Sequence, residues 1–335
     1  MQTFKGRFRG SVVVVTGASA GVGRATARAF AAAGASVGLL ARGPDGLAAA
    51  KKDVEDKGAH ALAVETDVAA ADQVEAAAEA IEEELGPIDV WVNNAMVSTL
   101  MPLSEMEPED FKRVTDVTYL GSVYGTMTAL RRMLPRNRGS IIQVGSALAY
   151  RGIPLQSAYC GAKHALQGFT ESVRCELMHE ASRVTISMVQ LPALNTPQFH
   201  WVKTSFDRHP QPVAPIYQPE LAAEAILWSA ANYRREVNVG ETTVATVIAD
   251  KLAPGLLDRY LAASGYDSQL DERPIEPDRS DNLWQPVPGD HGARGEFDER
   301  SWERSLQWAA SRHRRWIALG SGVAALAAAL KRRAS

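Results

Sequence analysis

Short apolar runs alternate with longer stretches of mixed polarity over the first 250 residues of the chain. Seven of these runs have the length and composition of buried parallel strands: 11–16, 35–41, 59–66, 88–92, 140–144, 184–191 and 236–239. The longer stretches between them have the composition of helices. This alternation predicts an α/β domain over residues 1–250, with a doubly wound, Rossmann-like parallel sheet of about seven strands and helices on both faces.

The pattern changes after this domain, and residues 251–335 are predicted to form a C-terminal extension. Residues 242–263 are predicted to be helical, with an interruption at Pro254-Gly255. The segment 264–300 is rich in Asp, Glu, Pro and Gly and has neither helical nor strand periodicity. It is predicted to be an extended arm, ordered only where it lies on the domain or on a partner subunit, with Trp284 and Phe297 as its anchors. Residues 301–315 are a further predicted helix.

The final segment, 316–330, is apolar and is flanked by basic residues at 312–315 and 331–333. Its length falls short of the ~20 residues that span a bilayer. Three alternatives stay open, namely an anchor lying on the membrane surface through 312–333, a helix packed on a partner, and a frayed tail.

Overall composition excludes some classes of function. A formal net charge of -3 gives no basic footprint for nucleic acid. Cys160 and Cys175 fall in one predicted helix, which does not suit a disulfide and predicts reduced thiols and a cytoplasmic protein. No group of His, Cys or acidic residues has metal-ligand spacing, so no metal is expected. The basic segment 1–10 is not followed by a long apolar run, and no signal peptide is expected.

A glycine-rich turn follows the first predicted strand and precedes a predicted helix. Gly17, Gly21 and Gly23 are spaced Gly-x-x-x-Gly-x-Gly. Glycines let the backbone approach a diphosphate, whose charge then lies at the N-terminus of the following helix. This arrangement predicts a dinucleotide site.

The residues that end the second and third strands bear on the choice of cofactor. An acid after the second strand would bind the ribose hydroxyls and repel a 2′-phosphate, whereas this chain has Ala41 and Arg42. Arg42 is therefore predicted to bind the phosphate, and NADP(H) is favoured over NAD(H). The alternative is a loop arginine facing water. Asp67 is expected to bond the adenine amino group or to cap the next helix.

Tyr159 and Lys163 lie four residues apart in a predicted helix, so their side chains leave the same face. The lysine is expected to lower the pKa of the tyrosine, which would then act as a general acid or base on a carbonyl or an alcohol. Two residues on a solvated helix face are the alternative. Ser146 follows the fifth strand and either polarises a carbonyl or caps a loop.

These motifs, Thr16-Gly17-x-x-x-Gly21-x-Gly23, Asn93-Asn94-Ala95, Ser146 and Tyr159-x-x-x-Lys163, resemble the short-chain dehydrogenase/reductase family over about residues 8–250. The resemblance implies an oxidoreductase that forms a dimer or tetramer. It implies that Ser146 binds the substrate carbonyl, Tyr159 exchanges the proton and Lys163 binds the nicotinamide ribose. The implied cofactor contacts are Thr16, Gly17, Ser19, Gly21, Val22, Gly23, Arg42, Asp67, Val68, Asn94, Ala95, Tyr159, Lys163, Pro192 and Thr196, the last at the carboxamide.

Two positions depart from the family pattern. Thr118 stands where the family usually carries an asparagine that holds a relay water, so Thr118 is expected to support a slower or rewired relay. Ala193 replaces a usual glycine. The segment 197–219 is rich in proline and aromatic residues, which favours either a lid over an apolar pocket or a long loop anchored by its aromatics.

The sequence therefore predicts an NADP(H)-dependent enzyme that interconverts a carbonyl and a secondary alcohol on a hydrophobic small molecule. The first alternative is a cofactor-binding protein with little turnover, because the relay asparagine is missing. A lyase or epimerase that retains its nucleotide is the second.

Overall fold

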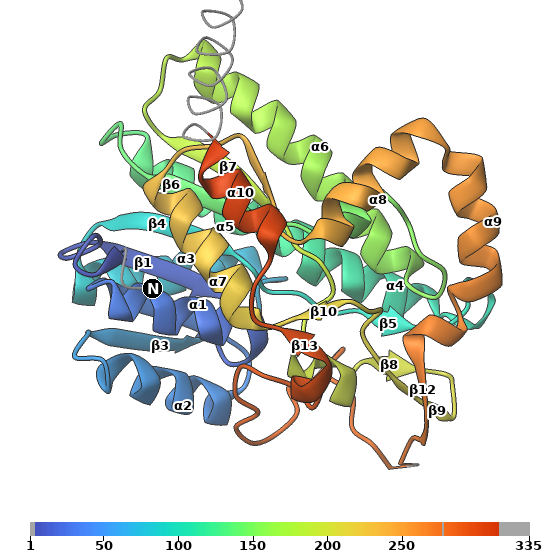
Figure 1. The fold of residues 1–335 in the computed structure, drawn as a ribbon. Helices are drawn as coiled ribbons and strands as arrows, with labels where there is room; N and C mark the ends of the chain where they lie inside the picture. Colours follow the sequence, from blue (N-terminus) through green and yellow to red (C-terminus); the bar gives the residue numbers. More distant parts are fainter. Residues whose placement is uncertain (1–3, 277, 315–335) are drawn as a thin grey trace, which may run out of the picture.

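The computed structural model describes residues 4–276 and 278–314. Seven parallel strands form one sheet in the order β11-β7-β6-β4-β1-β2-β3 (Figure 1). Their bounds are β1 Val12–Thr16, β2 Ser36–Ala41, β3 Ala61–Glu65, β4 Ile88–Asn93, β6 Ser140–Val144, β7 Thr185–Gln190 and β11 Glu236–Asn238. The doubly wound α/β fold is confirmed, and each predicted strand is found within two residues of its expected bounds.

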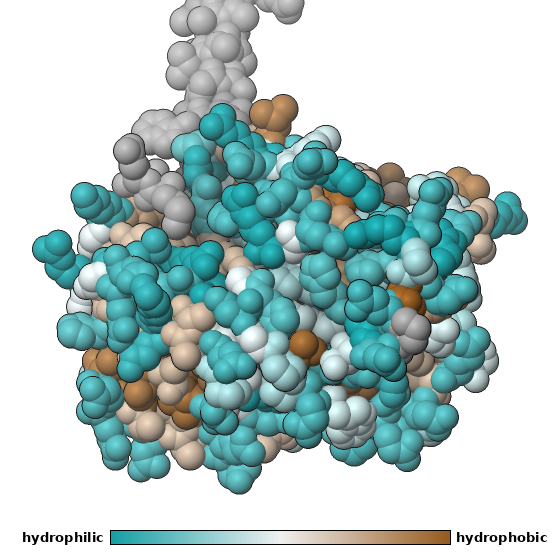
Figure 2. Space-filling view, turned by 90° about the horizontal axis from the view of Figure 1, so that it is seen from below, coloured by the Kyte–Doolittle hydropathy of each residue, from teal (hydrophilic) through white to brown (hydrophobic). Residues whose placement is uncertain are grey.

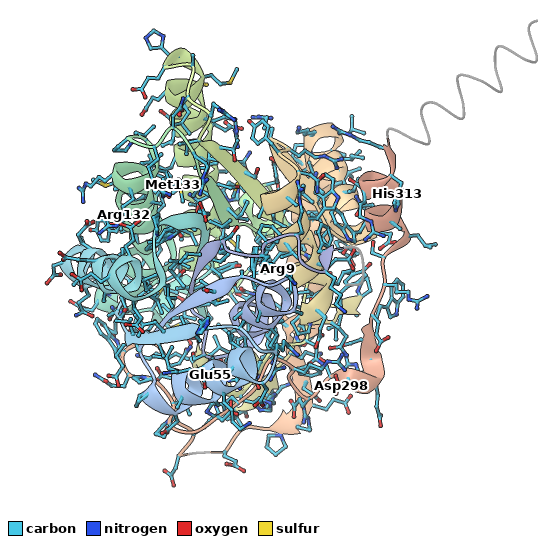
Figure 3. The ribbon with its side chains drawn as sticks, turned by 90° about the vertical axis from the view of Figure 1, so that its left-hand side faces the viewer. Arg9, Glu55, Arg132, Met133, Asp298 and His313 are labelled. Atoms are coloured by element: carbon cyan, nitrogen blue, oxygen red, sulfur yellow. The ribbon has the colours of Figure 1, made fainter. Side chains whose placement is uncertain are left out.

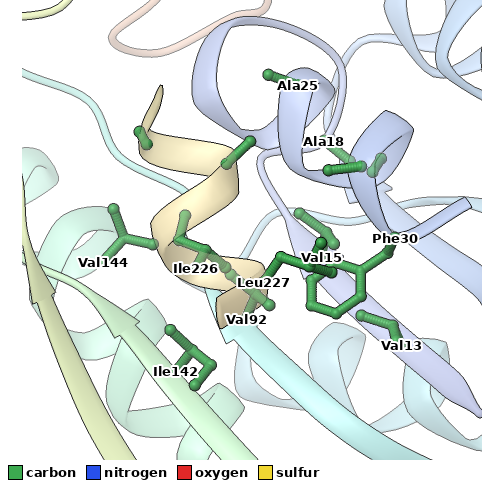
Figure 4. Close-up of a cluster of buried hydrophobic side chains, with 14 of the residues drawn as sticks. Val13, Val15, Ala18, Ala25, Phe30, Val92, Ile142, Val144, Ile226 and Leu227 are labelled. Atoms are coloured by element: carbon green, nitrogen blue, oxygen red, sulfur yellow. The ribbon is translucent and has the colours of Figure 1, made fainter. Parts of the chain in front are cut away.

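Helices cover both faces of the sheet. One face carries α1 (Gly21–Ala32), α2 (Pro44–Glu55) and α7 (Pro219–Ala231). The other face carries α3 (Ala71–Leu85), α4 (Pro108–Thr115), α5 (Gly121–Met133) and α6 (Ser157–His179). Because side chains alternate along a strand, Val13 and Val15 of β1 enter the first layer and Val12 and Val14 the second. Figure 4 shows the first layer, where strand side chains pack beneath Ile226 and Leu227 of α7 and beside Phe30 of α1.

Helices α4 and α5 follow each other without a loop. Between α4 and α5 the backbone takes a π-helical turn, η3 (Asp116–Leu120), which contains Thr118. Such turns inside helices occur frequently at functional sites.

The order of strands reverses between β1 and β4, and this fixes the position of the ligand crevice. From β1 the chain builds outward through β2 and β3, and then returns to place β4 on the other side of β1. The loops after β1 and β4 therefore diverge at the carboxyl edge of the sheet, where open α/β sheets bind their ligands.

The C-terminal extension folds back onto the α/β core. It contains α8 (Glu241–Leu252), α9 (Pro254–Ser264), η6 (Asp267–Gln269), β12 (Leu270–Pro274), η7 (Asp298–Arg300), β13 (Ser301–Trp302) and α10 (Leu306–Arg312). Strand β12 pairs antiparallel with β9 (Arg208–Pro210), and β13 pairs with β10 (Ile216–Tyr217). Figure 1 shows this orange and red part of the chain running below the sheet and returning to α7.

The segment 264–300, for which an extended arm was expected, lies on the domain in the structure, and part of it forms β12 because β9 offers it a partner far away in the sequence. The helix expected from residue 301 begins only at Leu306, since Ser301 and Trp302 pair with β10 and the Ser305 hydroxyl caps the helix by accepting from Trp308 N at 3.0 Å.

The C-terminal extension and helix α5 lie on opposite sides of the molecule. In Figure 3, Asp298 of the extension lies on the side away from Arg132 and Met133 of α5. Seen from below, the face that includes the extension is mostly hydrophilic, with small separate apolar spots (Figure 2). The apolar segment predicted at 316–330 lies outside the described residues. Among the helices that are described, none combines the length and the hydrophobicity that a bilayer crossing requires.

Candidate active site

A cavity of about 520 Å³ opens at the carboxyl edge of the sheet. Its walls come from four parts of the chain: the loops after the central strands, the start of α6, the segment after β7, and the C-terminal extension. Most of the predicted site residues line it: Gly17, Ser19, Gly21, Val22, Arg42, Asp67, Val68, Asn94, Ala95, Ser146, Tyr159, Lys163, Pro192 and Thr196. Thr16, Gly23 and Thr118 lie behind this wall.

Close packing of the backbone requires glycine at two positions of the turn after β1. Gly17 has φ of 66°, and a Cβ on it would lie 2.8 Å from Ala95 Cα. A Cβ on Gly23 would lie 2.0 Å from the Gly17 carbonyl oxygen. Helix α1 starts at Gly21, and Ala20 before it provides no side-chain cap. The turn thus places a helix N-terminus without a side-chain cap beside the cavity, which suits the diphosphate of a dinucleotide.

Thr16 and Asn94 join the ends of β1 and β4. The Thr16 hydroxyl accepts hydrogen bonds from Asn94 N at 2.9 Å and Ala95 N at 3.0 Å. In return, the Asn94 side-chain amide donates to the Thr16 carbonyl at 2.9 Å. These bonds fix the ends of β1 and β4 relative to each other at the strand reversal, which explains why a threonine and an asparagine occupy these positions.

The three candidate catalytic side chains share one wall of the cavity. Ser146 follows β6, and Gln190 of β7 fixes its backbone by accepting from Ser146 N at 2.8 Å. Tyr159 and Lys163 leave the same face of α6, as predicted. The Lys163 ammonium donates to the Val144 carbonyl at 2.7 Å and lies 5.5 Å from the centre of the Tyr159 ring.

The electrostatics of this wall differ from the sequence prediction. Burial raises the pKa of Tyr159 above its usual value, and a hydrogen bond with Ser146 only partly opposes the increase. The expectation of a Tyr159 pKa below its usual value is not met in this structure, because desolvation of the phenolate dominates. Burial also lowers the pKa of Lys163 to about 8. At neutral pH the tyrosine therefore carries its proton.

Thr118 is fully buried and bonded on both sides of its hydroxyl. It donates to the Val97 carbonyl at 2.8 Å and accepts from Val97 N at 3.1 Å. Its single hydroxyl hydrogen is thus used to brace the loop after β4. The prediction that Thr118 holds a relay water receives no support from this geometry.

Arg42 has partners that the sequence did not indicate. Its guanidinium donates to the carbonyl oxygens of Asn282, Leu283 and Trp284, at 2.5, 3.3 and 2.9 Å. The alternative of an arginine that merely faces water is therefore wrong. Burial, followed by the nearby Arg113, lowers the pKa of Arg42, while Asp67 opposes this shift. Positive charge is concentrated at this end of the cavity, which suits an anionic ligand.

Asp67 forms an ion pair with Arg113, a second arginine at this end of the cavity. Arg113 of α4 donates to one carboxylate oxygen of Asp67 at 2.6 Å and to the Leu283 carbonyl at 3.1 Å. The other oxygen accepts from Ala69 N at 3.0 Å. This bond closes the turn before α3, whose own N-cap has no side-chain bond, so the helix-capping alternative for Asp67 is wrong. Nothing in the local sequence around Arg113 indicated its role.

The aromatic segment after β7 both lines the cavity and packs on the extension. Phe199 and Trp201 are lining residues. The Phe199 ring meets Phe297 edge-on at 5.8 Å, and Trp201 meets His291 at 4.7 Å. These ring contacts agree with a long loop anchored by its aromatics, which also forms part of the cavity wall, while closure as a lid stays a prediction.

One cluster of possible metal ligands was not visible from spacing. Donor atoms of His200, His209 and Glu296 lie within 4.8 Å of one another. His200 and His209 come from the segment after β7 and Glu296 from the C-terminal extension, so no local sequence pattern connects all three. Arg273 donates to both oxygens of Glu296, at 2.9 and 2.7 Å, and already supplies positive charge there.

Comparison with known proteins places this site in a family. The sequence model of the short chain dehydrogenase family matches residues 11–205, which is more than half of the chain. An uncharacterized oxidoreductase of Bacillus subtilis, YxnA, is 36% identical over 324 residues, covering 96% of this chain and 90% of YxnA. The chain belongs to the short-chain dehydrogenase family.

Further relatives of this short-chain dehydrogenase have more specific names. Bovine 3-ketodihydrosphingosine reductase is 30% identical over 239 residues, covering 69% of this chain and 71% of that protein. A metagenomic short-chain oxidoreductase in complex with NADP is 27% identical with a TM-score of 0.59, covering 69% of this chain and 97% of that one. A Burkholderia phymatum enzyme in complex with NAD shares the fold, at 24% identity and a TM-score of 0.67, with 75% and 96% covered.

Family membership identifies the protein as an NAD(P)-dependent oxidoreductase that acts on a small molecule. It does not favour the alternative of a cofactor-binding protein with little turnover. Because the match to YxnA covers nearly all of this short-chain dehydrogenase, the likeness continues into the C-terminal extension.

Proposed function

We propose that this short-chain dehydrogenase is an NADP(H)-dependent carbonyl reductase for a hydrophobic ketone. The observation that carries the proposal is the shared wall formed by Ser146, Tyr159 and Lys163 beside the glycine turn. A bound nicotinamide would supply the hydride for the carbonyl carbon. The chain would supply the proton and the groups that orient the ketone.

Tyr159 is the proton donor in this proposal. Burial keeps its phenol protonated at neutral pH, which is the form that gives a proton to a carbonyl oxygen as the alcohol forms. The Ser146 hydroxyl orients and polarises that oxygen. Lys163 holds the nicotinamide ribose, and its positive charge stabilises the tyrosinate left after transfer.

The preference for NADP(H) rests on charge at the opposite end of the cavity. Arg42 and Arg113 lie close together, and Asp67 balances only one of the two charges. A 2′-phosphate would balance the second positive charge. The bonds of Arg42 to the extension use only its two terminal nitrogens, so its Nε–H is not used in them and could donate to the phosphate. The NADP complex of the metagenomic relative agrees with this preference, and the NAD complex of the Burkholderia enzyme shows that the fold accepts either cofactor.

An apolar wall supports the choice of a hydrophobic substrate. Beyond the catalytic side chains the cavity is lined by aliphatic and aromatic groups: Leu148, Ile153, Phe199, Val202, Leu257 and Leu261. Such a wall binds an alkyl or ring system by removing it from water. The name of the bovine relative refers to a 3-keto compound, which agrees with a ketone as the reacting group.

The test is a fluorescence titration with NADPH and NADH, followed by turnover of ketones that differ only in alkyl chain length. We expect tighter binding of NADPH and a kcat/KM that rises with chain length. Binding without turnover across the series would refute the reductase assignment. Equal affinity for the two cofactors would refute the phosphate preference while leaving the reductase in place.

Three further predictions stay untested. The long helix α6 is proposed to contribute to a homo-oligomer, as the family resemblance implied. A cytoplasmic location and a peripheral membrane contact through 312–333 also stay predictions, and residues 315–335 of that segment lie outside the described part of the chain.

A further inference from the structure

The C-terminal extension crosses the end of the cavity where Arg42, Asp67 and Arg113 lie, which we call the adenosine end. Five residues between positions 281 and 293 of the extension line the cavity: Asn282, Pro286, Val287, Gly289 and His291. We name residues 281–293 the strap. The glycine turn and the catalytic wall belong to a pattern shared within the family, whereas the strap is built from the extension.

The first half of the strap is held by arginines. Arg42 donates to three successive carbonyl oxygens at positions 282–284, and Arg113 donates to the middle one, Leu283. The Leu283 side chain is fully buried. The indole N–H of Trp284 donates to Asp110 at 3.0 Å, and Arg113 lies over its ring at 5.6 Å. Arg42 and Arg113, which form part of the adenosine end, therefore also hold the strap.

The second half of the strap is tied to the glycine turn and to α2. Gly289 N donates to Asp45 at 2.8 Å, and Asp290 accepts from the buried Arg24 at 3.0 Å. The Gly292 carbonyl accepts from Gly21 N at 3.0 Å. Gly21 is the first residue of α1, so the strap meets the same helix N-terminus that suits the diphosphate.

We propose that the strap closes over the adenosine half of the bound dinucleotide and must open to let the cofactor enter and leave. The inference rests on the cofactor position proposed above. Its contacts join the end of β2, α4 and the start of α1, which are the three elements that surround the adenosine end. Leu283 and Ala293 near the two ends of the strap are buried in the core. Between them, the bonds of Trp284, Gly289 and Asp290 are exposed or part-buried polar bonds, which can exchange with water at modest cost.

The contact between Gly43 and Pro286 allows the strap to be locked. A Cβ built on Gly43 lies 3.2 Å from Pro286 Cβ, which is slightly closer than the ~3.5–4.5 Å of natural disulfides. Gly43 has φ of -89°, so a side chain is compatible with its backbone. The variant Gly43→Cys/Pro286→Cys should therefore form a disulfide between strap and core. Cys175 is exposed and is replaced by serine, while Cys160 is buried.

The experiment measures NADPH association and release by stopped-flow fluorescence in the oxidised and reduced forms of this variant. The matched control is Gly43→Ser/Pro286→Ser, which has similar volume and no bond. We expect oxidation of the free protein to slow association at least tenfold. Oxidation with NADPH already bound should slow release at least tenfold, and dithiothreitol should reverse both effects.

Each outcome separates the strap from the proposed function. Rates that do not depend on the disulfide would overturn the strap while leaving the cofactor site intact. A reduced variant and a serine control that bind neither NADPH nor NADH, together with a wild-type protein that also fails, would instead overturn the proposed function. A pair that does not form a disulfide under oxidant would show that the strap does not lie on Gly43, and this also contradicts the proposal.

Hydrogen exchange on the unmodified protein gives an independent check. Closure over the cofactor predicts slower exchange of amides in 282–292 when NADPH is bound. Unchanged exchange in this segment, with protection elsewhere in the glycine turn, would contradict closure.

Discussion

The two ends of the proposed cofactor site are built in different ways. The catalytic wall consists of Ser146, Tyr159 and Lys163, which come from β6 and α6 and lie within eighteen positions of one another in the sequence. The adenosine end combines Arg42, Arg113 and the strap, whose bonds join residues 170 to 242 positions apart. The catalytic wall is formed by residues close together in the sequence, whereas the adenosine end forms only when the C-terminal extension folds back onto the core.

Because of this difference, we expect the catalytic wall to govern the chemical step and the adenosine end to govern the entry and release of the cofactor. The catalytic wall is fixed by a strand and a long helix, so its geometry changes little with the surroundings. The adenosine end is completed by a segment whose middle part, between the buried Leu283 and Ala293, is held by exposed or part-buried polar bonds, and such bonds open at lower cost than a packed core. Variants at the two ends should therefore affect different steps of the reaction.

The largest effect is expected for Tyr159→Phe, which removes the proposed proton donor. Turnover should fall by about two to four orders of magnitude, while NADPH affinity stays near that of the wild type. Steady-state kinetics and a fluorescence titration measure the two quantities. Tyr150→Phe is the matched control, because that hydroxyl donates to Glu236 and does not line the cavity, so it should retain activity. Retained turnover in Tyr159→Phe would show that another group supplies the proton.

The next effect concerns Lys163, a buried cation. Its pKa falls from 10.5 to about 8 in the folded protein, which corresponds to a cost of roughly 3 kcal/mol when the ammonium is buried. Below pH 8 this cost is fully present, and it disappears as the pH rises toward 10.5. The free energy of unfolding of the wild type, relative to Lys163→Met, should therefore increase between pH 7.5 and 9.5.

Urea unfolding of the two proteins at several pH values measures this difference, and the subtraction cancels the titration of other groups. The lost bond to Val144 adds a constant that does not change with pH. A difference that is flat with pH would mean that Lys163 keeps an ordinary pKa in the folded state.

At the adenosine end, Arg42→Ala should weaken NADPH by about 10- to 100-fold, because a charge-assisted hydrogen bond to the phosphate is lost. NADH affinity should change less than about threefold, so it serves as the internal control. Arg42→Lys keeps the charge but loses the planar fork that binds the strap carbonyls. An equal loss for both cofactors would indicate that Arg42 acts only by holding the strap.

The smallest effect is expected for Trp284→Phe, which removes one hydrogen bond, to Asp110, and keeps an aromatic ring. The loss of about 1 kcal/mol should speed NADPH release about fivefold and leave kcat for a bound substrate unchanged where chemistry limits the rate. Stopped-flow displacement of NADPH measures the release rate. A slower release in this variant would contradict the role of the Asp110 bond in closing the strap.

The sequence predicted the fold and the catalytic wall because their signals are local. The strand β1 and the glycine turn are contiguous, and Tyr159 and Lys163 are one helical turn apart. Their pKa values were not predictable, since the shift of Tyr159 depends on desolvation by neighbours from other elements. The bonds of the Thr118 hydroxyl were not predictable for the same reason, because its partner Val97 lies in a loop after β4.

The adenosine end was only half predictable. The position of Arg42 after β2 placed it correctly at the cavity, but its partners lie in a segment without periodicity. Backbone carbonyls carry no side-chain signature, so no composition or spacing could have indicated that positions 282–284 bind a guanidinium. The strand β12 escaped prediction similarly, because its partner β9 lies about sixty residues earlier.

The order in which a ribosome makes this chain gives the strap a consequence during biosynthesis. The glycine turn, the catalytic wall and Thr196 all emerge before any part of 281–293 exists. A newly made core therefore presents an uncovered cofactor cleft, and domains generally begin to fold from the N-terminal side during synthesis. A first cofactor molecule can enter at that stage without any opening step, and the arrival of the last part of the chain would then enclose it.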